Sequence, residues 1–156
     1  PTGNGDKAWR VMMASEAEWE KSARGSDGRI YPWEGQADPN KANYDDTGIG
    51  GTSAVGSFPR GASPYGVEDL SGNVWEWTRS LWGKDGDKPT FGYPYQPLDG
   101  REDLTAGDDT LRVVRGGSFH RPVRDVRAAS RYGGTPDDRD RRVGFRVVVT
   151  PFFSDL

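Results

Sequence analysis

Residues 66–78 read GVEDLSGNVWEWT, a turn-rich segment that leads directly into an alternating one. Its end holds Val74, Glu76 and Thr78, which are separated by Trp75 and by a second tryptophan. A period of two residues is typical of a β-strand, because successive side chains point to opposite faces of a sheet. The segment therefore predicts a strand that follows a tight turn.

The size and composition of the chain predict one loop-rich domain. The chain has 156 residues, and we expect a single domain over residues 1–156. Hydrophobic residues make up 33% of it, and 22 glycines with 11 prolines indicate many turns. Six tryptophans, six tyrosines and six phenylalanines can bury large areas, so we expect aromatic residues to anchor the core.

The residue types also exclude several classes of site. The chain has no cysteine, which excludes disulfides and thiolate chemistry, and its single histidine, His120, cannot form an imidazole metal triad. A net charge of −3 gives no reason to expect a nucleic-acid-binding protein. No apolar stretch reaches the length of a membrane span, and no signal peptide is visible. A start at Pro1 is compatible with a processed part of a longer protein, and the compartment is unknown.

One helix is clearly marked. Residues 15–25 read SEAEWEKSARG, in which the first serine and Glu18 form a capping box and the last glycine is typical of a helix end. We expect a helix over Glu16–Arg24, with Trp19 and Ala23 facing the core.

The segment from 25 to 65 has neither helical nor strand periodicity, and we expect a long loop that something must hold in place. Asn43, Asp45 and Asp46 could bind a cation there. Equally, they could be ordinary turn-forming residues.

The rest of the chain predicts an α+β domain with short, irregular strands. Residues 83–109 form an oxygen-rich stretch, which we expect to be a surface insertion with a solvated charged face. Two short β-branched runs follow, at 111–118 and 143–149, and are expected to be strands. We expect a third strand between them, at 126–130.

Five motifs in a fixed order carry a resemblance to a known family. They are SEAEWEKSARG, YPWEG, GVEDLSGNVWEWT, RVVRGGSF and GFRVV. Together they resemble the formylglycine-generating-enzyme/sulfatase-modifying domain family, over roughly Arg10 to Val149. The resemblance implies an irregular, loop-rich C-type lectin-like fold with short antiparallel strands and one clear helix. Family domains usually begin with further strands, so the chain resembles the later part of a typical member.

Two departures from the family concern catalysis. Members that oxidise a sulfatase cysteine hold copper with a cysteine pair, and relatives that use non-haem iron draw on histidines. This chain has no cysteine and one histidine, so the resemblance does not imply catalysis. We expect a non-enzymatic binding domain. The alternative is a formylglycine-generating-type oxidoreductase, or an accessory domain, whose metal ligands lie outside this chain.

The resemblance also implies a structural calcium site. In relatives, side chains matching Asp69 and Glu76 and backbone carbonyls matching Gly72 and Val74 hold the ion, and a second ion lies near the position of Asn43. Ca²⁺ prefers several oxygen ligands and tolerates irregular geometry. In the alternative interpretation, the aspartate is a turn residue and the glutamate pairs with an arginine across strands.

Residues 115–148 resemble the variable region of proteins diversified by diversity-generating retroelements, which share this scaffold. Their template carries asparagine codons whose adenines are rewritten, and the spacing from Ser118 to Gly144 matches it without a gap. The matching positions form the predicted ligand-binding set. They are His120, Arg121, Pro122, Asp125, Ser130, Tyr132, Gly133, Gly134, Asp138, Asp140, Arg141 and Arg142.

Codon chemistry supports this interpretation. Each of the twelve residues is reached from AAC by changing only the two adenines, whereas Lys, Glu, Gln, Met and Trp are not reached and do not occur in residues 115–148. Fixed residues lie between the variable ones, and two positions, Phe119 and Val123, depart from the usual pattern. The fixed residues are Arg127, Ala128, Ala129, Arg131, Arg139, Gly144, Phe145 and Arg146.

Strand geometry would let such a segment vary, because one face of a sheet can change while the other maintains the fold. We expect the fixed arginines to hold loop backbones through their several donors. The exposed patch of tyrosine, arginine and aspartate suits a protein ligand. Carboxylates lie between the arginines in the sequence, at Asp137, Asp138 and Asp140. Their negative charges would repel phosphate, which argues against nucleic acid as the ligand. The alternatives are a solvated loop of an ordinary lectin-like domain and a purely structural domain.

Overall fold

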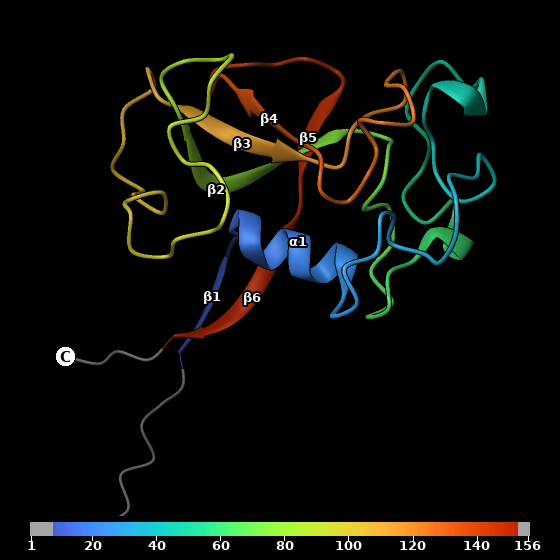
Figure 1. Ribbon diagram of the computed structural model, residues 1–156, viewed down its shortest axis with the longest axis horizontal. Coiled ribbons are helices and arrows are strands. Elements are labelled where there is room, and N and C mark those ends of the chain that lie inside the picture. Colours follow the sequence, from blue (N-terminus) through green and yellow to red (C-terminus); the bar gives the residue numbers. More distant parts are fainter. Residues whose placement is uncertain (1–7, 153–156) are drawn as a thin grey trace, which may run out of the picture.

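Two small sheets and one α-helix organise residues 8–152, the part of the chain that the computed structural model describes (Figure 1). One sheet is an antiparallel ribbon of β1 (Ala8–Met13) and β6 (Val147–Phe152). The other has the order β4–β3–β2–β5. Its strands are β2 (Trp75–Gly83), β3 (Leu111–Arg115), β4 (Arg131–Gly134) and β5 (Val143–Phe145).

Strand β2 lies inside the larger sheet, between β3 and β5. It pairs antiparallel with β3, where Glu76 is opposite Arg115, and parallel with β5, where Glu76 is opposite Gly144. The strand predicted from the tryptophan alternation is therefore confirmed. Among the described strands, β2–β5 is the parallel pair in a fold that otherwise has the expected antiparallel pairing.

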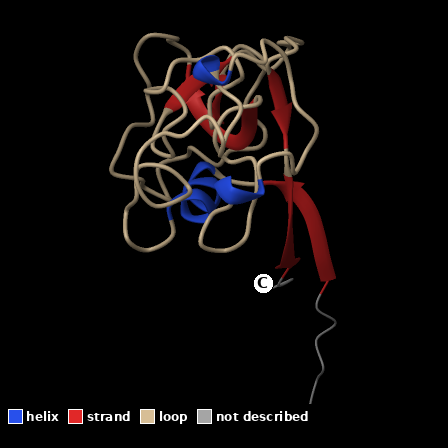
Figure 2. Ribbon diagram, turned by 90° about the vertical axis from the view of Figure 1, so that its right-hand side faces the viewer, coloured by secondary structure: helices blue, strands red, loops and turns tan. Residues whose placement is uncertain are grey.

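The predicted helix is confirmed as α1 (Glu16–Arg24). Its capping box forms as expected: Ser15 Oγ accepts a hydrogen bond from the Glu18 amide at 3.2 Å, and the Glu18 carboxylate accepts one from the Ser15 amide at 2.7 Å. Gly25 ends the helix with a φ of 65°, in the left-handed region that favours glycine. The helix lies beside the larger sheet and the ribbon (Figures 1 and 2).

Aromatic residues anchor the core, as the composition predicts. Two buried clusters form, and in the second Tyr31 stacks on Trp33 with ring centroids 5.3 Å apart. The first contains Ala14, Trp19, Ala23, Leu70 and Ala128. The second contains Tyr31, Trp33, Ala42, Tyr44 and Val126.

The long loop after α1 is held by backbone contacts with the turn before β2. The Asn43 carbonyl accepts a hydrogen bond from the Asn73 amide at 2.7 Å, and Asn43 forms a parallel bridge with Gly72. A Cβ at Gly72 would lie 2.1 Å from the Asn43 carbonyl oxygen, so only glycine allows this approach. Two short 3-10 helices, Asp45–Thr47 and Pro59–Gly61, complete the loop.

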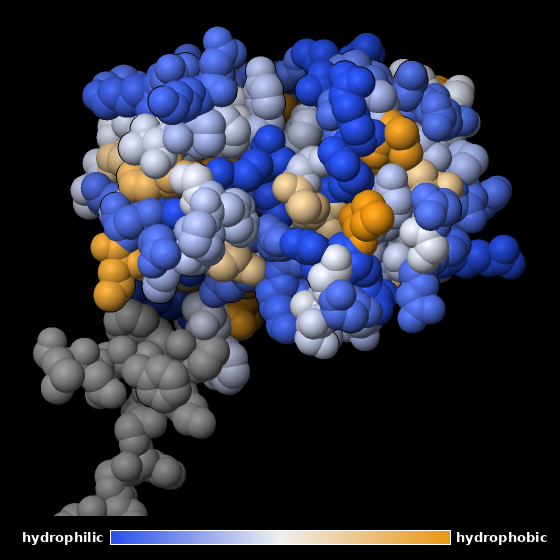
Figure 3. Space-filling view, viewed as in Figure 1, coloured by the Kyte–Doolittle hydropathy of each residue, from blue (hydrophilic) through white to orange (hydrophobic). Residues whose placement is uncertain are grey.

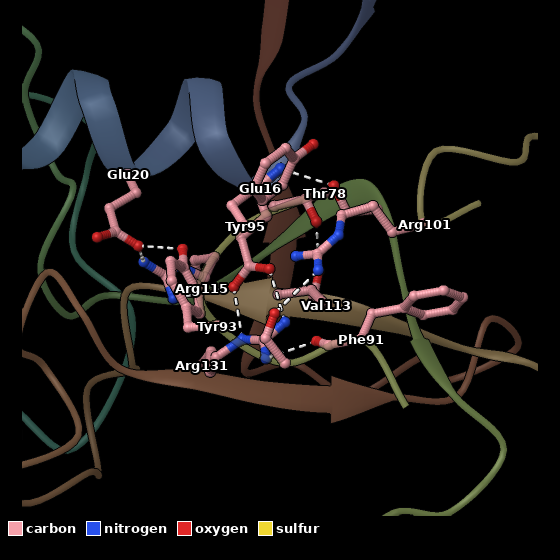
Figure 4. Close-up of polar contacts among 12 residues, drawn as sticks. Glu16, Glu20, Thr78, Phe91, Tyr93, Tyr95, Arg101, Val113, Arg115 and Arg131 are labelled. Carbon is pink, nitrogen blue, oxygen red and sulfur yellow. Dashed lines mark hydrogen bonds and ion pairs between the residues drawn. The ribbon is translucent and has the colours of Figure 1, made fainter. Parts of the chain in front are cut away.

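A buried cluster of charges joins α1 to the larger sheet (Figure 4). The Glu16 side chain, 0% exposed, accepts hydrogen bonds from Arg115 Nη1 at 3.1 Å and from Arg131 Nε and Nη2, each at 2.7 Å. Arg115, also 0% exposed, reaches Glu20 at 2.7 Å. Because Arg115 ends β3 and Arg131 begins β4, one carboxylate fixes both strands against the helix.

The predicted strand at 126–130 is wrong. These residues form turns, closed by Arg127 Nε and Ser130 Oγ, which both donate to the Arg124 carbonyl at 2.8 Å. The strand lies immediately after them, as β4. Residues 116–118 also lie outside β3, because Gly116 and Gly117 turn the chain with φ values of 92° and 76°.

Two further expectations need correction. The run 143–149 is not one strand, because the chain changes sheets at Arg146, between β5 and β6. The insertion 83–109 is not wholly solvated: Arg101 is 1% exposed and lies against the rings of Phe91 and Tyr95. Strand β1 was not expected from the sequence. Within residues 8–152, no helix has the length and apolar character that crossing a membrane requires.

We expect Glu16→Gln to lower the free energy of unfolding by about 3 to 5 kcal/mol, because it leaves two arginines without their shared buried carboxylate. Urea unfolding monitored by tryptophan fluorescence measures the change. Glu34→Gln, at an exposed position, is the control and should have little effect. Equal stability of the two variants would show that the buried charges do not hold the sheet to the helix.

Candidate ligand-binding site

Eight of the twelve predicted variable positions line one hollow of about 370 Å³ over the β4–β3–β2–β5 sheet. The hollow also includes side chains of β2, β3 and β5. The eight positions are His120, Arg121, Tyr132, Gly133, Gly134, Asp138, Asp140 and Arg142.

Tryptophans form the inner wall of this hollow. Trp75 and Trp77 of β2 line it, together with Val114 of β3. Tyr132 is 53% exposed and is tilted against two indoles, with ring centroids 6.2 Å from Trp75 and 6.4 Å from Trp82. The exposed tyrosine thus extends an aromatic surface that begins in the core.

Two variable positions, Gly133 and Gly134, lie directly against tryptophan rings. A Cβ at Gly133 would lie 2.8 Å from Trp82 ring atoms, and one at Gly134 would lie 2.5 Å from a Trp77 ring atom. A side chain at either position must therefore displace an indole. The expectation that the core does not contact the variable side chains is wrong at these two positions.

Paired charges surround the opening. Arg142 forms a two-pronged ion pair with Asp140, one contact of which joins Nε to Oδ1 at 2.6 Å. The arginine lowers the pKa of the Asp140 carboxyl to about 2. Arg121 lies over the Trp75 ring at 5.7 Å, and its Nε is 3.1 Å from the Asp125 carboxylate.

His120 is bonded on both sides. Its Nδ1 lies 3.0 Å from Ser118 Oγ, and its Nε2 lies 3.1 Å from Arg142 Nη1. Burial lowers the pKa of His120, and the positive charges of Arg142 and Arg121 lower it further. The imidazole is therefore neutral at pH 7 and adds no charge to the rim.

A second hollow of about 500 Å³ adjoins the first, because the two share His120, Asp140 and Arg142. Arg141, another predicted position, lines this second hollow and lies 5.5 Å from the Phe119 ring centroid. On its far side are three loop residues. They are Asp45, Gly48 and Gly50.

Three predicted positions line neither hollow. Asp125 lies behind Arg121, to which it is paired, and Pro122 is half-buried in the same turn. Ser130 lies at a different hollow, beside Arg24 and Arg29. The structure therefore brings most of the predicted set together, but not Ser130.

Fixed arginines hold the backbone behind the site, as expected. Arg131 donates to the Phe91 carbonyl at 2.8 Å, and Arg146 donates to the carbonyls of Glu68 and Asp69 at 3.1 and 3.2 Å. Phe145, also predicted to be fixed, is 69% exposed, so burial does not account for that prediction.

The residues predicted to bind calcium at the β2 turn do not fit a cation as they are arranged. Glu76 Oε1 and Oε2 accept hydrogen bonds from Arg146, each at 2.5 Å, and Oε2 also accepts one from Trp19 Nε1 at 2.6 Å. The Asp69 carboxylate accepts from the Gly56 amide at 2.8 Å. A guanidinium thus neutralises Glu76, which matches the alternative of an arginine pair.

The second predicted ion remains a prediction. Asn43 is 1% exposed, and its Oδ1 has no hydrogen-bond partner, which is compatible with a ligand to a cation. Gly72 and Val74 lie at the same turn, and the Val74 side chain is beside Gly144. Across residues 8–152, however, no three carboxylate, histidine or cysteine side chains form a group that could hold a metal ion.

Comparisons with known proteins place the chain among relatives of both catalytic and non-catalytic kinds. The family model for the sulfatase-modifying factor enzyme 1-like domain matches residues 5–151. The "Inactive C-alpha-formylglycine-generating enzyme 2" of Mus musculus is 36% identical, over 89% of this chain and 43% of that protein. The "Formylglycine-generating enzyme" of Thermomonospora curvata is 34% identical, over 89% of this chain and 49% of that protein.

Among solved structures, Treponema denticola variable protein 1 superposes with a TM-score of 0.66. It is 26% identical and is matched over 93% of this chain and 48% of that one. The chain spans about half the length of the curated relatives that it matches.

We expect excess EDTA to leave the thermal unfolding midpoint unchanged, because Arg146 already supplies the positive charge beside Glu76. Differential scanning calorimetry before and after chelation measures this. A lower midpoint in EDTA that added Ca²⁺ restores, and added Mg²⁺ does not, would contradict the expectation and support an ion at Asn43.

Proposed function

The chain belongs to the family of sulfatase-modifying factor enzyme 1-like domains, and we propose that it is a non-enzymatic member that binds a protein ligand. Its binding surface would be the variable set of a diversity-generating retroelement. The observation that carries this proposal is the gathering of eight predicted positions around one hollow.

The chemistry of the chain supports a binding role over a catalytic one. It has no cysteine, and its only histidine is held between Ser118 and Arg142. The similarity to an inactive formylglycine-generating enzyme and to a variable protein is compatible with this role.

The surface has the composition of a protein-binding patch. Tyrosine and arginine are the residues that most often anchor such interfaces, and both are present at the hollow. A phosphate at the hollow would lie close to the carboxylates of Asp138 and Asp140 as well as to the arginines. This repulsion disfavours nucleic acid as the ligand. Affinity would come from a few anchors at the centre and not from contact area alone.

A catalytic alternative rests on the similarity to the Thermomonospora curvata enzyme. In that case, metal ligands would come from outside this chain. Copper or iron bound stoichiometrically by a longer form of the protein would favour it. A structural calcium ion near Asn43 is compatible with either function, because the Asn43 Oδ1 atom has no hydrogen-bond partner.

Sequencing the same locus from sibling isolates tests the proposal directly. We expect substitutions to fall at the twelve predicted positions and to spare the neighbouring fixed ones, because only adenine positions of the template are rewritten. Arg131 beside Tyr132 is the most informative pair. Substitutions spread evenly over residues 115–148, or none at all, would contradict a retroelement origin.

We also expect asparagine to be tolerated at the exposed variable positions and not at the fixed positions between them. Tyr132→Asn, Asp138→Asn and Arg141→Asn are at exposed positions and should each change the free energy of unfolding by about 0.5 kcal/mol or less. The matched variant Arg131→Asn should cost about 3 kcal/mol or more, because it removes two hydrogen bonds to buried Glu16. Urea unfolding compares the four variants. Similar losses of unfolding free energy in all four would contradict the division into variable and fixed positions.

A further inference from the structure

Glycine at 133 and 134 lets two indole rings lie directly against β4. Neither residue has a φ in the left-handed region, so the backbone does not require glycine at either position. What glycine permits is close packing, because the rings of Trp82 and Trp77 occupy the space that a Cβ would need. Gly134 thus keeps Trp77 in place as part of the aromatic wall, beside the exposed ring of Tyr132.

The charges at the hollow cancel. Arg121 and Arg142 line it, and so do Asp138 and Asp140. Since His120 is neutral, these four side chains give no net charge. A cationic ligand would meet the two arginines and an anionic one the two aspartates, so an uncharged group is favoured.

Three polar groups of the rim are bonded to one another. Arg142 is bonded to Asp140 and His120, and His120 is bonded to Ser118. The aromatic side of the hollow is more accessible, because the Tyr132 ring is 53% exposed and Trp77 is half-buried. Such a surface can receive another ring in tilted or offset packing.

We propose that the hollow receives an uncharged aromatic side chain from the protein ligand, against the exposed Tyr132 ring and the Trp77 indole. This inference rests on the proposed function and names the chemistry of the ligand. The volume of about 370 Å³ is near the lower end of small-molecule sites, which span roughly 300–1,000 Å³. It suits one side chain. Charged rim residues would then contact the ligand backbone around that ring.

The test uses N-acetyl-tryptophanamide as the probe and the indole N–H signals of the chain as the readout in ¹⁵N NMR. We expect the Trp75 and Trp77 signals to shift with a dissociation constant on the order of 1 mM. Buried Trp19 and Trp33 act as internal references. N-acetyl-lysinamide, N-acetyl-aspartamide and methyl glucoside should shift neither signal at the same concentration.

Gly134→Asn introduces a residue that the template itself encodes and displaces the Trp77 ring, so it should weaken binding of the tryptophan probe about tenfold or more. Tyr132→Ser removes a wall and should also weaken it, which keeps the test valid if the first variant fails to fold. Ser130→Asn is the matched control, because this variable position lies at another hollow. It should leave binding unchanged.

An equal or stronger response to methyl glucoside or to the lysine probe would overturn the aromatic ligand, as would unchanged binding in both hollow variants. Absence of any shift would also overturn it. Locus sequencing does not depend on the probe. Position-confined variation together with a failed titration would therefore reject only the aromatic ligand, while a failed locus prediction would reject the retroelement proposal itself.

Discussion

The fold depends on a single buried carboxylate. Glu16, in the first turn of α1, accepts hydrogen bonds from Arg115 at the end of β3 and from Arg131 at the start of β4. A chain with 33% hydrophobic residues has limited apolar area to define how strands meet a helix. Directional ion pairs can define that register, because an uncompensated buried charge is costly in any other arrangement. The ion pair between Arg146 and Glu76 is a second such directional contact, at the point where the chain passes from β5 to β6.

This framework explains how a variable surface can exist on so small a sheet. Along β4, Arg131 points to the buried carboxylate, and the next residue, Tyr132, points to solvent beside two indoles. The groups that fix the strand and the groups that face a ligand therefore alternate residue by residue. On the face seen in Figure 3, hydrophobic residues form small, separate patches within a hydrophilic surface.

The local signals in the sequence were sufficient for some elements and not for others. The capping box places α1 correctly because its bonds are made within four residues. The strand predicted at 126–130 is wrong because the side chains of Arg127 and Ser130 bond to the Arg124 carbonyl and close turns, a competition that propensity does not include. Partners far apart in sequence, such as Arg146 and Glu76, could only be proposed as alternatives. The template predicted which positions vary. It could not show that position 133 lies against the Trp82 ring, because that contact joins residues far apart in the sequence.

The variable positions are consequently not equivalent. Those on loops, such as Asp138 and Arg141, change the charge of the rim and leave the sheet untouched. Those at Gly133 and Gly134 lie against ring atoms of the framework itself, so a substitution there opens or closes the hollow before it adds any new group. Diversity in such a domain would act in two ways, through surface chemistry at the loops and through cavity shape at β4. The second is limited by how far Trp77 and Trp82 can move without breaking the packing that supports the strand.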